Sequence, residues 1–167
     1  MKKIITLLAI VGLFSLQSCT VTDSGSIVSD IPTSEIFEVS TSFTSTNGYS
    51  KLIPLNPRIY SSDIVLVYRL SGTTSQGGDI WKLLPETHYF TDGTLDFAYD
   101  FDYTTTDISV FMVGNNLQTV STNYRLNQVL RIVITPAGFS QAIDKNNINA
   151  VMSALKVDKS QIQKIQM

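Results

Sequence analysis

Three carboxylates lie two or four residues apart in segment 95–103, a spacing that raises the question of metal chemistry. Asp96, Asp100 and Asp102 alternate there with aromatic residues, which is the two-residue period of a strand. Calcium takes several oxygen ligands at about 2.3–2.6 Å, usually from a loop that wraps the ion. Side chains two apart on one face of a strand are roughly 6.5–7 Å apart, too far to share an ion. We therefore favour a solvated sheet face, and we expect no metal and no cofactor.

Aromatic side chains offer a second kind of chemistry, because a stacking platform binds sugars or peptides. The candidates for such a platform, with the three aspartates at its rim, are Trp81, Tyr89, Tyr99 and Tyr103. Alternating aromatics more commonly fill the core between two sheets, where each buries roughly 150–250 Å². We favour the core and keep a glycan- or ligand-binding surface as the alternative.

His88 is the single histidine, so a site that needs two histidines is excluded and a hydrolase has one available base. Beside Tyr89 and Phe90 at a strand edge, it is typical of a structural residue. The chain has no Gly-x-Ser-x-Gly, His-Glu-x-x-His, Cys-x-x-Cys or phosphate-binding glycine loop. The sequence therefore predicts a protein that is not an enzyme and has no catalytic residue.

Cys19, the only cysteine, closes an apolar run that starts after Lys2 and Lys3. The run is shorter than the roughly 20 residues of a membrane span and is typical of a cleaved signal segment. Its end resembles the lipobox of bacterial lipoproteins, formed here by Leu16, Gln17, Ser18 and Cys19. That resemblance implies cleavage before Cys19 and a membrane lipid attached to it. Acylation leaves no thiol for a disulfide, a metal or a nucleophile.

The charge pattern fits attachment through lipid. The formal net charge is −2 and no basic run is present, which argues against a nucleic-acid partner. Thr20 follows the cysteine where aspartate is the usual signal for retention in the inner membrane. We expect a cell-envelope protein anchored in the outer membrane, with its orientation and its protein or glycan partner open.

Composition divides the chain into a signal peptide (1–18), a flexible tether (19–33) and a folded domain (34–167). The small polar residues of the tether give it a root-mean-square reach of roughly 20 Å. Asn47-Gly48 and Asp92-Gly93 are turn signals between strands. The predicted strands cover residues 37–43, 63–70, 80–84 with a continuation at 88–90, 95–103, 108–113 and 128–135.

One helix is predicted near the C-terminus. Ile148, Val151, Met152 and Leu155 form a single apolar stripe, and Asn146 or Asn147 caps its start. About seven strands with one short helix predict an all-β, antiparallel, immunoglobulin-like sandwich. A closed barrel is the alternative, and the tail beyond residue 157 is either a short edge strand or frayed.

Three segments of the folded part suggest a family. They are 63–70 (Asp-Ile-Val-Leu-Val-Tyr-Arg-Leu), 79–85 (Asp-Ile-Trp-Lys-Leu-Leu-Pro) and 131–136 (Arg-Ile-Val-Ile-Thr-Pro), followed by a short helix. This pattern resembles a group of small uncharacterised lipoproteins from Bacteroidetes-type bacteria, some with a collagen-like stretch after the lipidated cysteine. The resemblance implies an envelope location and carries over no site or activity. We expect a structural, adhesive or assembly role.

Overall fold

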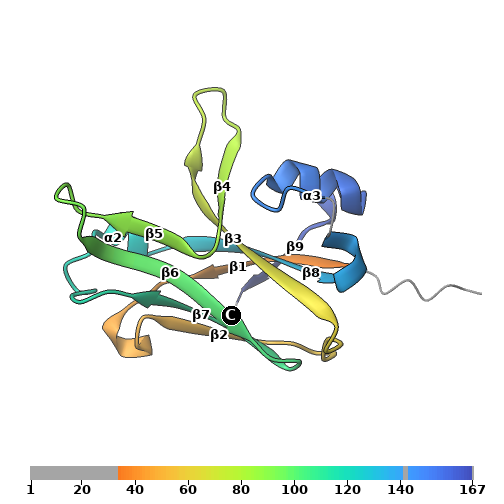
Figure 1. Cartoon of the computed structure of the whole chain (residues 1–167), viewed down its shortest axis with the longest axis horizontal. Helices are drawn as coiled ribbons and strands as arrows, with labels where there is room; N and C mark the ends of the chain where they lie inside the picture. The colour runs from red at the N-terminus through yellow and green to blue at the C-terminus, as the bar shows by residue number, and fades with distance from the viewer. Residues whose placement is uncertain (1–33, 141–142, 167) are drawn as a thin grey trace, which may run out of the picture. The chain divides into compact units, whose positions relative to one another are not determined.

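The computed structural model describes residues 34–140 and 143–166, which form two β-sheets packed face to face (Figure 1). Sheet A has the strand order β4-β3-β8-β1-β9 and sheet B the order β2-β7-β6-β5. The strands of sheet A are β4 (Asp79–Leu83), β3 (Asp63–Thr73), β8 (Gln128–Pro136), β1 (Glu35–Thr41) and β9 (Gln163–Gln166). Those of sheet B are β2 (Ser50–Pro54), β7 (Asp107–Val113), β6 (Leu95–Tyr103) and β5 (Glu86–Tyr89).

The helical segments are short and lie between the strands. They are η1 (Ser45–Asn47), α2 (Thr122–Arg125), η2 (Ala137–Ser140), α3 (Ile148–Leu155) and η3 (Lys159–Gln161). The predicted β-sandwich with one short C-terminal helix is confirmed. The signal peptide, the lipobox with Cys19 and the tether fall outside the described residues.

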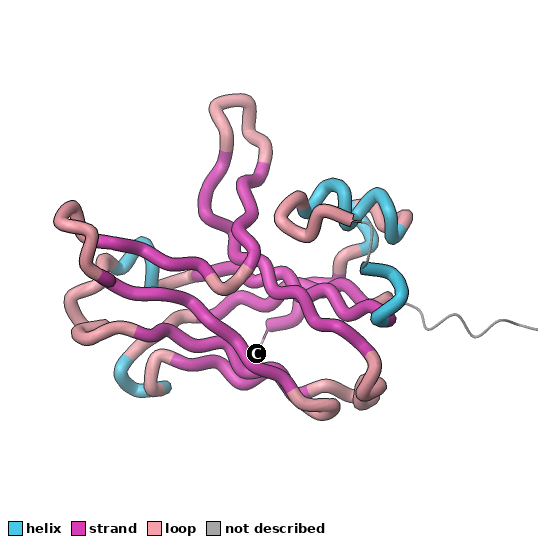
Figure 2. The backbone as a smooth tube through the Cα atoms, viewed as in Figure 1, coloured by secondary structure: helices cyan, strands magenta, loops and turns pink. Residues whose placement is uncertain are grey.

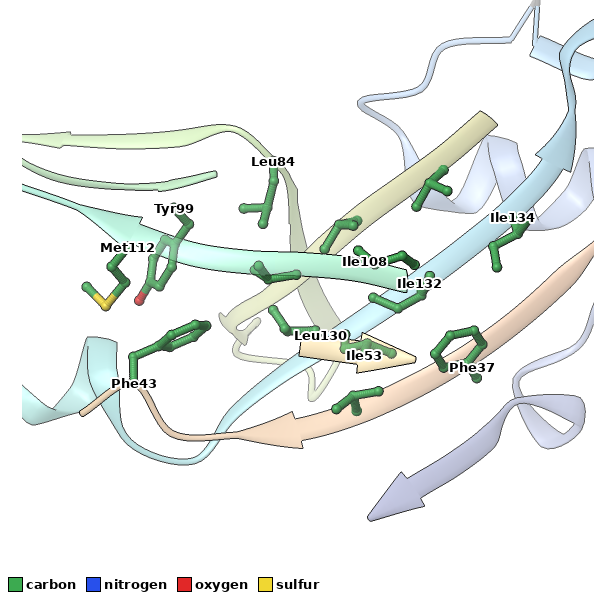
Figure 3. Close-up of a cluster of buried hydrophobic side chains, with 14 of the residues drawn as sticks. Phe37, Phe43, Ile53, Leu84, Tyr99, Ile108, Met112, Leu130, Ile132 and Ile134 are labelled. Atoms are coloured by element: carbon green, nitrogen blue, oxygen red, sulfur yellow. The ribbon is translucent and has the colours of Figure 1, made fainter. Parts of the chain in front are cut away.

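The core forms because the inward residues of both sheets are apolar in phase with the two-residue strand period. Val67 on β3, Ile132 on β8 and Val110 on β7 are fully buried between the sheets, with the neighbours drawn in Figure 3. Burial of one such side chain stabilises the fold by about 1.5–3 kcal/mol. Phe97 and Tyr99 on β6 also point inward, as the alternation of segment 95–103 predicted.

The described residues contain nine strands rather than about seven, because the sequence does not predict β2 and because the tail forms the short edge strand β9, one of the two alternatives given for it. Strand β2 has no apolar alternation, and β9 pairs in parallel with β1 at the edge of sheet A. Strand β3 also runs on to Thr73, so that the β3–β4 hairpin projects from the sheets in Figure 2.

The predicted strand 80–84 and its continuation at 88–90 belong to different sheets. Pro85 has no N–H to donate to a ladder, and the chain passes there from β4 in sheet A to β5 in sheet B. Leu84 still donates its N–H to the carbonyl oxygen of Val67 at 2.9 Å and is buried. This change of sheet places β5 opposite β3, across the interior of the sandwich.

Helix α3 covers part of the outer face of sheet A. Its buried residues pack on apolar side chains of β3 and β8, in one cluster that contains Ile148, Val151, Met152, Leu66, Tyr68 and Val133. Of the two predicted caps, Asn147 is the one used: its Oδ1 accepts the N–H groups of Asn149 and Ala150. The hydroxyl of Tyr68 donates to the carbonyl oxygen of Lys145 at 2.6 Å and fixes the approach to α3.

Candidate functional site

A charged cluster lies between the sheets at the end of the sandwich where β5 meets β3. Arg69 is on β3, in phase with the buried Val65 and Val67, and Glu86 is on the facing strand β5. The Arg69 Nε and Nη2 donate to the two carboxylate oxygens of Glu86 at 2.8 Å each. Nη1 of Arg69 donates to Oε1 of Gln128 at 2.9 Å. The guanidinium thus joins three strands from two sheets.

This pairing keeps both partners charged. Burial by itself raises the pKa of Glu86, but the hydrogen bond and charge of Arg69, followed by His88, outweigh burial and hold the pKa below its ordinary value. Burial by itself lowers the pKa of Arg69, and the hydrogen bond to Glu86 reverses the effect. A carboxylate held in this way is a poor general base, because its affinity for a proton is reduced.

His88 completes the cluster. Its Nε2 lies 3.0 Å from Oε1 of Glu86, and its ring stacks on Phe97 with centroids 4.3 Å apart. The ring of Tyr124 packs against it at 4.9 Å, and about a quarter of the side chain (24%) is exposed. Within the described part of the chain, its ring makes no hydrogen bond to a hydroxyl. The arrangement that activates a serine nucleophile is therefore not formed here.

Tyr99 belongs to the same cluster, and burial determines both its pKa and its accessibility. Tyr99 is fully buried beneath Arg69, whose guanidinium carbon lies 4.7 Å from the centre of its ring. Burial raises the pKa of the Tyr99 phenol, and its hydroxyl donates to the carbonyl oxygen of Tyr124. Tyr99 is thus part of the interior and is not available as an exposed stacking surface.

The four predicted platform aromatics lie in separate places. Trp81 is half-buried on the outer face of sheet A, where the guanidinium carbon of Arg131 sits 4.0 Å from its ring centre. Tyr89 is 65% exposed beside the β5–β6 hairpin, and Tyr103 is 42% exposed at the opposite end of β6. The structure therefore does not bring Trp81, Tyr89, Tyr99 and Tyr103 into one platform. The core position that we favoured for these aromatics is confirmed for Tyr99 and is wrong for the other three.

The three predicted aspartates follow the strand alternation. Asp96 and Asp100 are half-buried and Asp102 is exposed, on the face of β6 opposite Phe97 and Tyr99. Asp100 accepts the N–H of Phe101 at 2.8 Å. Across residues 34–140 and 143–166, no three His, Cys, Asp or Glu side chains are grouped so as to hold a metal ion.

A second ion pair lies on the outer face of sheet A. Arg131 on β8 donates from Nε and Nη2 to one oxygen of Glu38 on β1, at 3.1 and 2.6 Å. The same guanidinium covers the ring of Trp81, whose Nε1 is buried and has no hydrogen-bond partner in the described residues. Arg131 therefore links three strands on this face, as Arg69 does in the interior.

An open groove of about 790 Å³ lies where the end of β1, the edge strand β2 and the start of β8 meet. Lys51 is its one charged residue, and the other lining side chains are mostly hydroxyls and amides. The lining consists of Ser40, Thr41, Ser42, Asn47, Ser50, Lys51, Leu52, Asn127 and Val129. We call this feature the Lys51 groove.

Sequence reasoning missed the two arginines, their carboxylate partners and the Lys51 groove. One signal was present: Arg69 stands in phase with Val65 and Val67, and Glu86 stands in phase with His88. A charged residue on the buried side of a strand must find a partner, because an unpaired charge in the interior is strongly unfavourable. The identity of that partner depends on the packing of the two sheets.

Comparisons with family models, with curated proteins and with solved structures give no match to this chain. Among the described residues, no helix combines the length and apolar character that crossing a membrane requires.

Proposed function

We propose that the chain is a lipid-anchored protein of the cell envelope, held in the outer membrane through acylated Cys19. In this proposal the β-sandwich serves a structural, adhesive or assembly role and catalyses no reaction. The observation that carries it is the run from Leu16 to Cys19, with its lipobox-like end after an apolar segment. Strand β1 begins at Glu35, sixteen positions beyond Cys19, which leaves a short tether between lipid and domain.

The use of the buried charges supports a role without catalysis. Arg69 and Arg131 are each nearly buried and each paired with a carboxylate, and both pairs connect neighbouring or facing strands. Charges used in this way stabilise one arrangement of strands. They leave His88 next to a carboxylate that Arg69 already neutralises.

Fatty-acid labelling tests the anchor. Cells expressing the full chain are grown with an alkyne analogue of palmitate, and the labelled protein is followed by mass and by membrane fraction. We expect label on the wild type and on a Thr22→Ala control, and none on Cys19→Ala. A wild-type chain without label, or a labelled Cys19→Ala chain, contradicts the proposal.

A second candidate function is a glycan- or ligand-binding module presented on the anchor. The Lys51 groove favours it, because a cation without a counter-charge borders a polar hollow there. The test is binding of a defined oligosaccharide to the full chain, and an absence of binding contradicts this second function while leaving the anchor untouched.

A further inference from the structure

We propose that the Lys51 groove binds an acidic carbohydrate, whose carboxylate pairs with the Lys51 ammonium while its hydroxyls bond to the groove lining. This inference rests on the second function proposed above and is independent of the lipid anchor.

Lys51 occupies a position that belongs to the core side of its strand. It pairs in register with Val110, which is fully buried, and residues directly opposite on antiparallel strands point to the same face. Because β2 is the edge of sheet B, the inward-facing lysine reaches the rim of the sandwich. Its ammonium has neither a hydrogen bond nor an ion pair with any residue that the structure describes.

Such a lysine has a known structural use, since an inward charge on an edge strand prevents pairing with another strand. That use requires a charge of either sign at the position. The lining of the Lys51 groove, by contrast, has one positive charge and no carboxylate, which favours an anionic ligand. The two roles therefore make different predictions for reversal of the charge.

Hydroxyl groups of the lining are free to bind. The side chains of Ser40, Thr41 and Ser50 make no hydrogen bond within the described residues. Ser42 is different: its Oγ accepts the N–H of Asn127 at 3.0 Å, and its carbonyl oxygen accepts the Asn47 amide at 2.7 Å. The groove thus has a rim held by hydrogen bonds at Ser42, and its lining includes hydroxyls that have no partner among the described residues.

The backbone that borders the groove is held in left-handed conformations. Tyr49 has a φ of 54° and Asn127 a φ of 52°. A bulky residue such as tyrosine rarely adopts this region, because the conformation strains its backbone. Bonds from Tyr49 N–H to Thr44 O at 2.8 Å and from Met112 N–H to Tyr49 O at 2.9 Å hold the strained residue in place. The loops on both sides of the groove are therefore fixed before a ligand arrives.

The lining favours a sugar over a peptide. A peptide that added a strand to β2 would meet the inward Lys51 and, at Pro54, a residue without an N–H donor. A sugar instead presents hydroxyls around its ring, which match the serine, threonine and asparagine side chains. Leu52, which is 59% exposed, and Val129 also border the groove.

The test measures binding of tetragalacturonic acid to the purified full chain in detergent by isothermal titration calorimetry. The matched probes are its fully methyl-esterified form, which is neutral, and a poly-glutamate peptide of equal charge. The variants are Lys51→Glu and Lys51→Gln, with Lys82→Glu as the control. Lys82 is exposed on β4, outside the Lys51 groove, and its change alters net charge as much as Lys51→Glu does.

We expect the wild type and Lys82→Glu to bind the acid form, and the ester to bind at least about tenfold more weakly. Lys51→Gln is expected to lose about tenfold or more, the loss that removal of one charge-assisted hydrogen bond produces. Lys51→Glu is expected to abolish binding while the chain stays folded and non-aggregated, because a charge still protects the edge. That combination separates the binding role from edge protection.

Other results overturn the inference in distinguishable ways. Unchanged binding by both Lys51 variants places the ligand elsewhere and leaves the ligand-binding function standing. Equal binding of the neutral ester contradicts an acidic ligand, and equal binding of poly-glutamate contradicts a carbohydrate. Failure of the wild type to bind any of the three probes contradicts both this inference and the second function.

Discussion

Arg69 and Glu86 join the two sheets through a pair of hydrogen bonds, each 2.8 Å long. Their side chains are only 4% and 11% exposed, so neither charge is well solvated without the other. A buried ion pair adds little net stability compared with apolar residues, but loss of one partner is costly. The pair therefore acts on specificity: it favours the one packing in which β5 faces β3.

Removing the charge of Glu86 tests this relationship. Glu86→Gln leaves the Arg69 guanidinium nearly buried without a counter-charge, and we expect the free energy of unfolding to fall by about 3 kcal/mol. Urea unfolding followed by circular dichroism measures the loss. As a control, Asp79→Asn breaks the exposed pair with Lys159 and should cost less than about 1 kcal/mol. Equal losses in the two variants would show that burial of the Arg69 pair does not increase the free energy lost when its carboxylate is neutralised.

Acid should weaken the fold through the same carboxylate. The pKa of Glu86 in the folded protein lies below its ordinary 4.5, because Arg69 and His88 outweigh the opposing effect of burial. A lowered pKa gives stability that is present above the unfolded value and is lost as pH falls through the folded value. We expect the unfolding free energy of the wild type to decline below about pH 4.5, and that of Glu86→Gln to decline less. Parallel pH profiles for the two proteins would refute the assignment.

Sequence alone predicts the strands in which apolar and polar residues alternate along the whole strand. Phe97 and Tyr99 alternate with polar residues in β6, and the stripe of α3 has a cap at Asn147, so each element is specified locally. Strand β2 has no such pattern because Lys51 stands on its inward side. The sequence does not predict the Lys51 groove for the same reason, because the groove borders β2.

The charged cluster could not be predicted from the sequence, because its members meet only through the topology of the two sheets. Arg69 and Glu86 lie seventeen positions apart and meet because the chain changes sheets at Pro85. The alternation indicates that Arg69 faces inward, but it does not say which strand will face it. The aromatic platform is not formed for a related reason. Trp81 and Tyr99 are on different sheets, and Trp81 lies on the outer face of sheet A whereas Tyr99 faces the interior.

Alkali should act on α3 through Tyr68. Burial, followed by the charge of Asp144, raises the pKa of Tyr68 from 10.0 to about 12. A raised pKa gives stability that is complete below the unfolded value and is lost as pH rises through the folded value. We expect the unfolding free energy to fall between pH 10 and pH 12, and to fall less in Tyr68→Phe.

Tyr68→Phe also removes the hydrogen bond to the carbonyl oxygen of Lys145, at a cost of about 1 kcal/mol near neutral pH. Phenolate absorbance against pH should lose one late-titrating group in this variant, and amide exchange in α3 should accelerate. Tyr60→Phe, which removes a 69% exposed phenol, serves as the control. Unchanged exchange in α3 would contradict the proposed link between Tyr68 and the helix.

Gly114 tests how closely the chain packs after β7. A Cβ added there would lie 2.8 Å from the carbonyl oxygen of Asp96 and 2.9 Å from Cδ2 of Leu117. Asp96 belongs to β6 next to the buried Phe97, so relief of the clash requires movement of a core strand. We expect Gly114→Ala to lower the free energy of unfolding by about 1–3 kcal/mol, the usual cost of overpacking.

Gly72→Ala on β3 is the matched substitution, because no atom lies within 4 Å of the added Cβ. Its backbone does not require a positive φ, so alanine reduces the freedom of the unfolded chain and should be neutral or stabilising by up to about 1 kcal/mol. Thermal unfolding of the two variants side by side measures the difference. Equal unfolding temperatures for the two variants would contradict this prediction. They would show that β6 can shift to accommodate the added Cβ, so that the close contact at Gly114 does not constrain the fold.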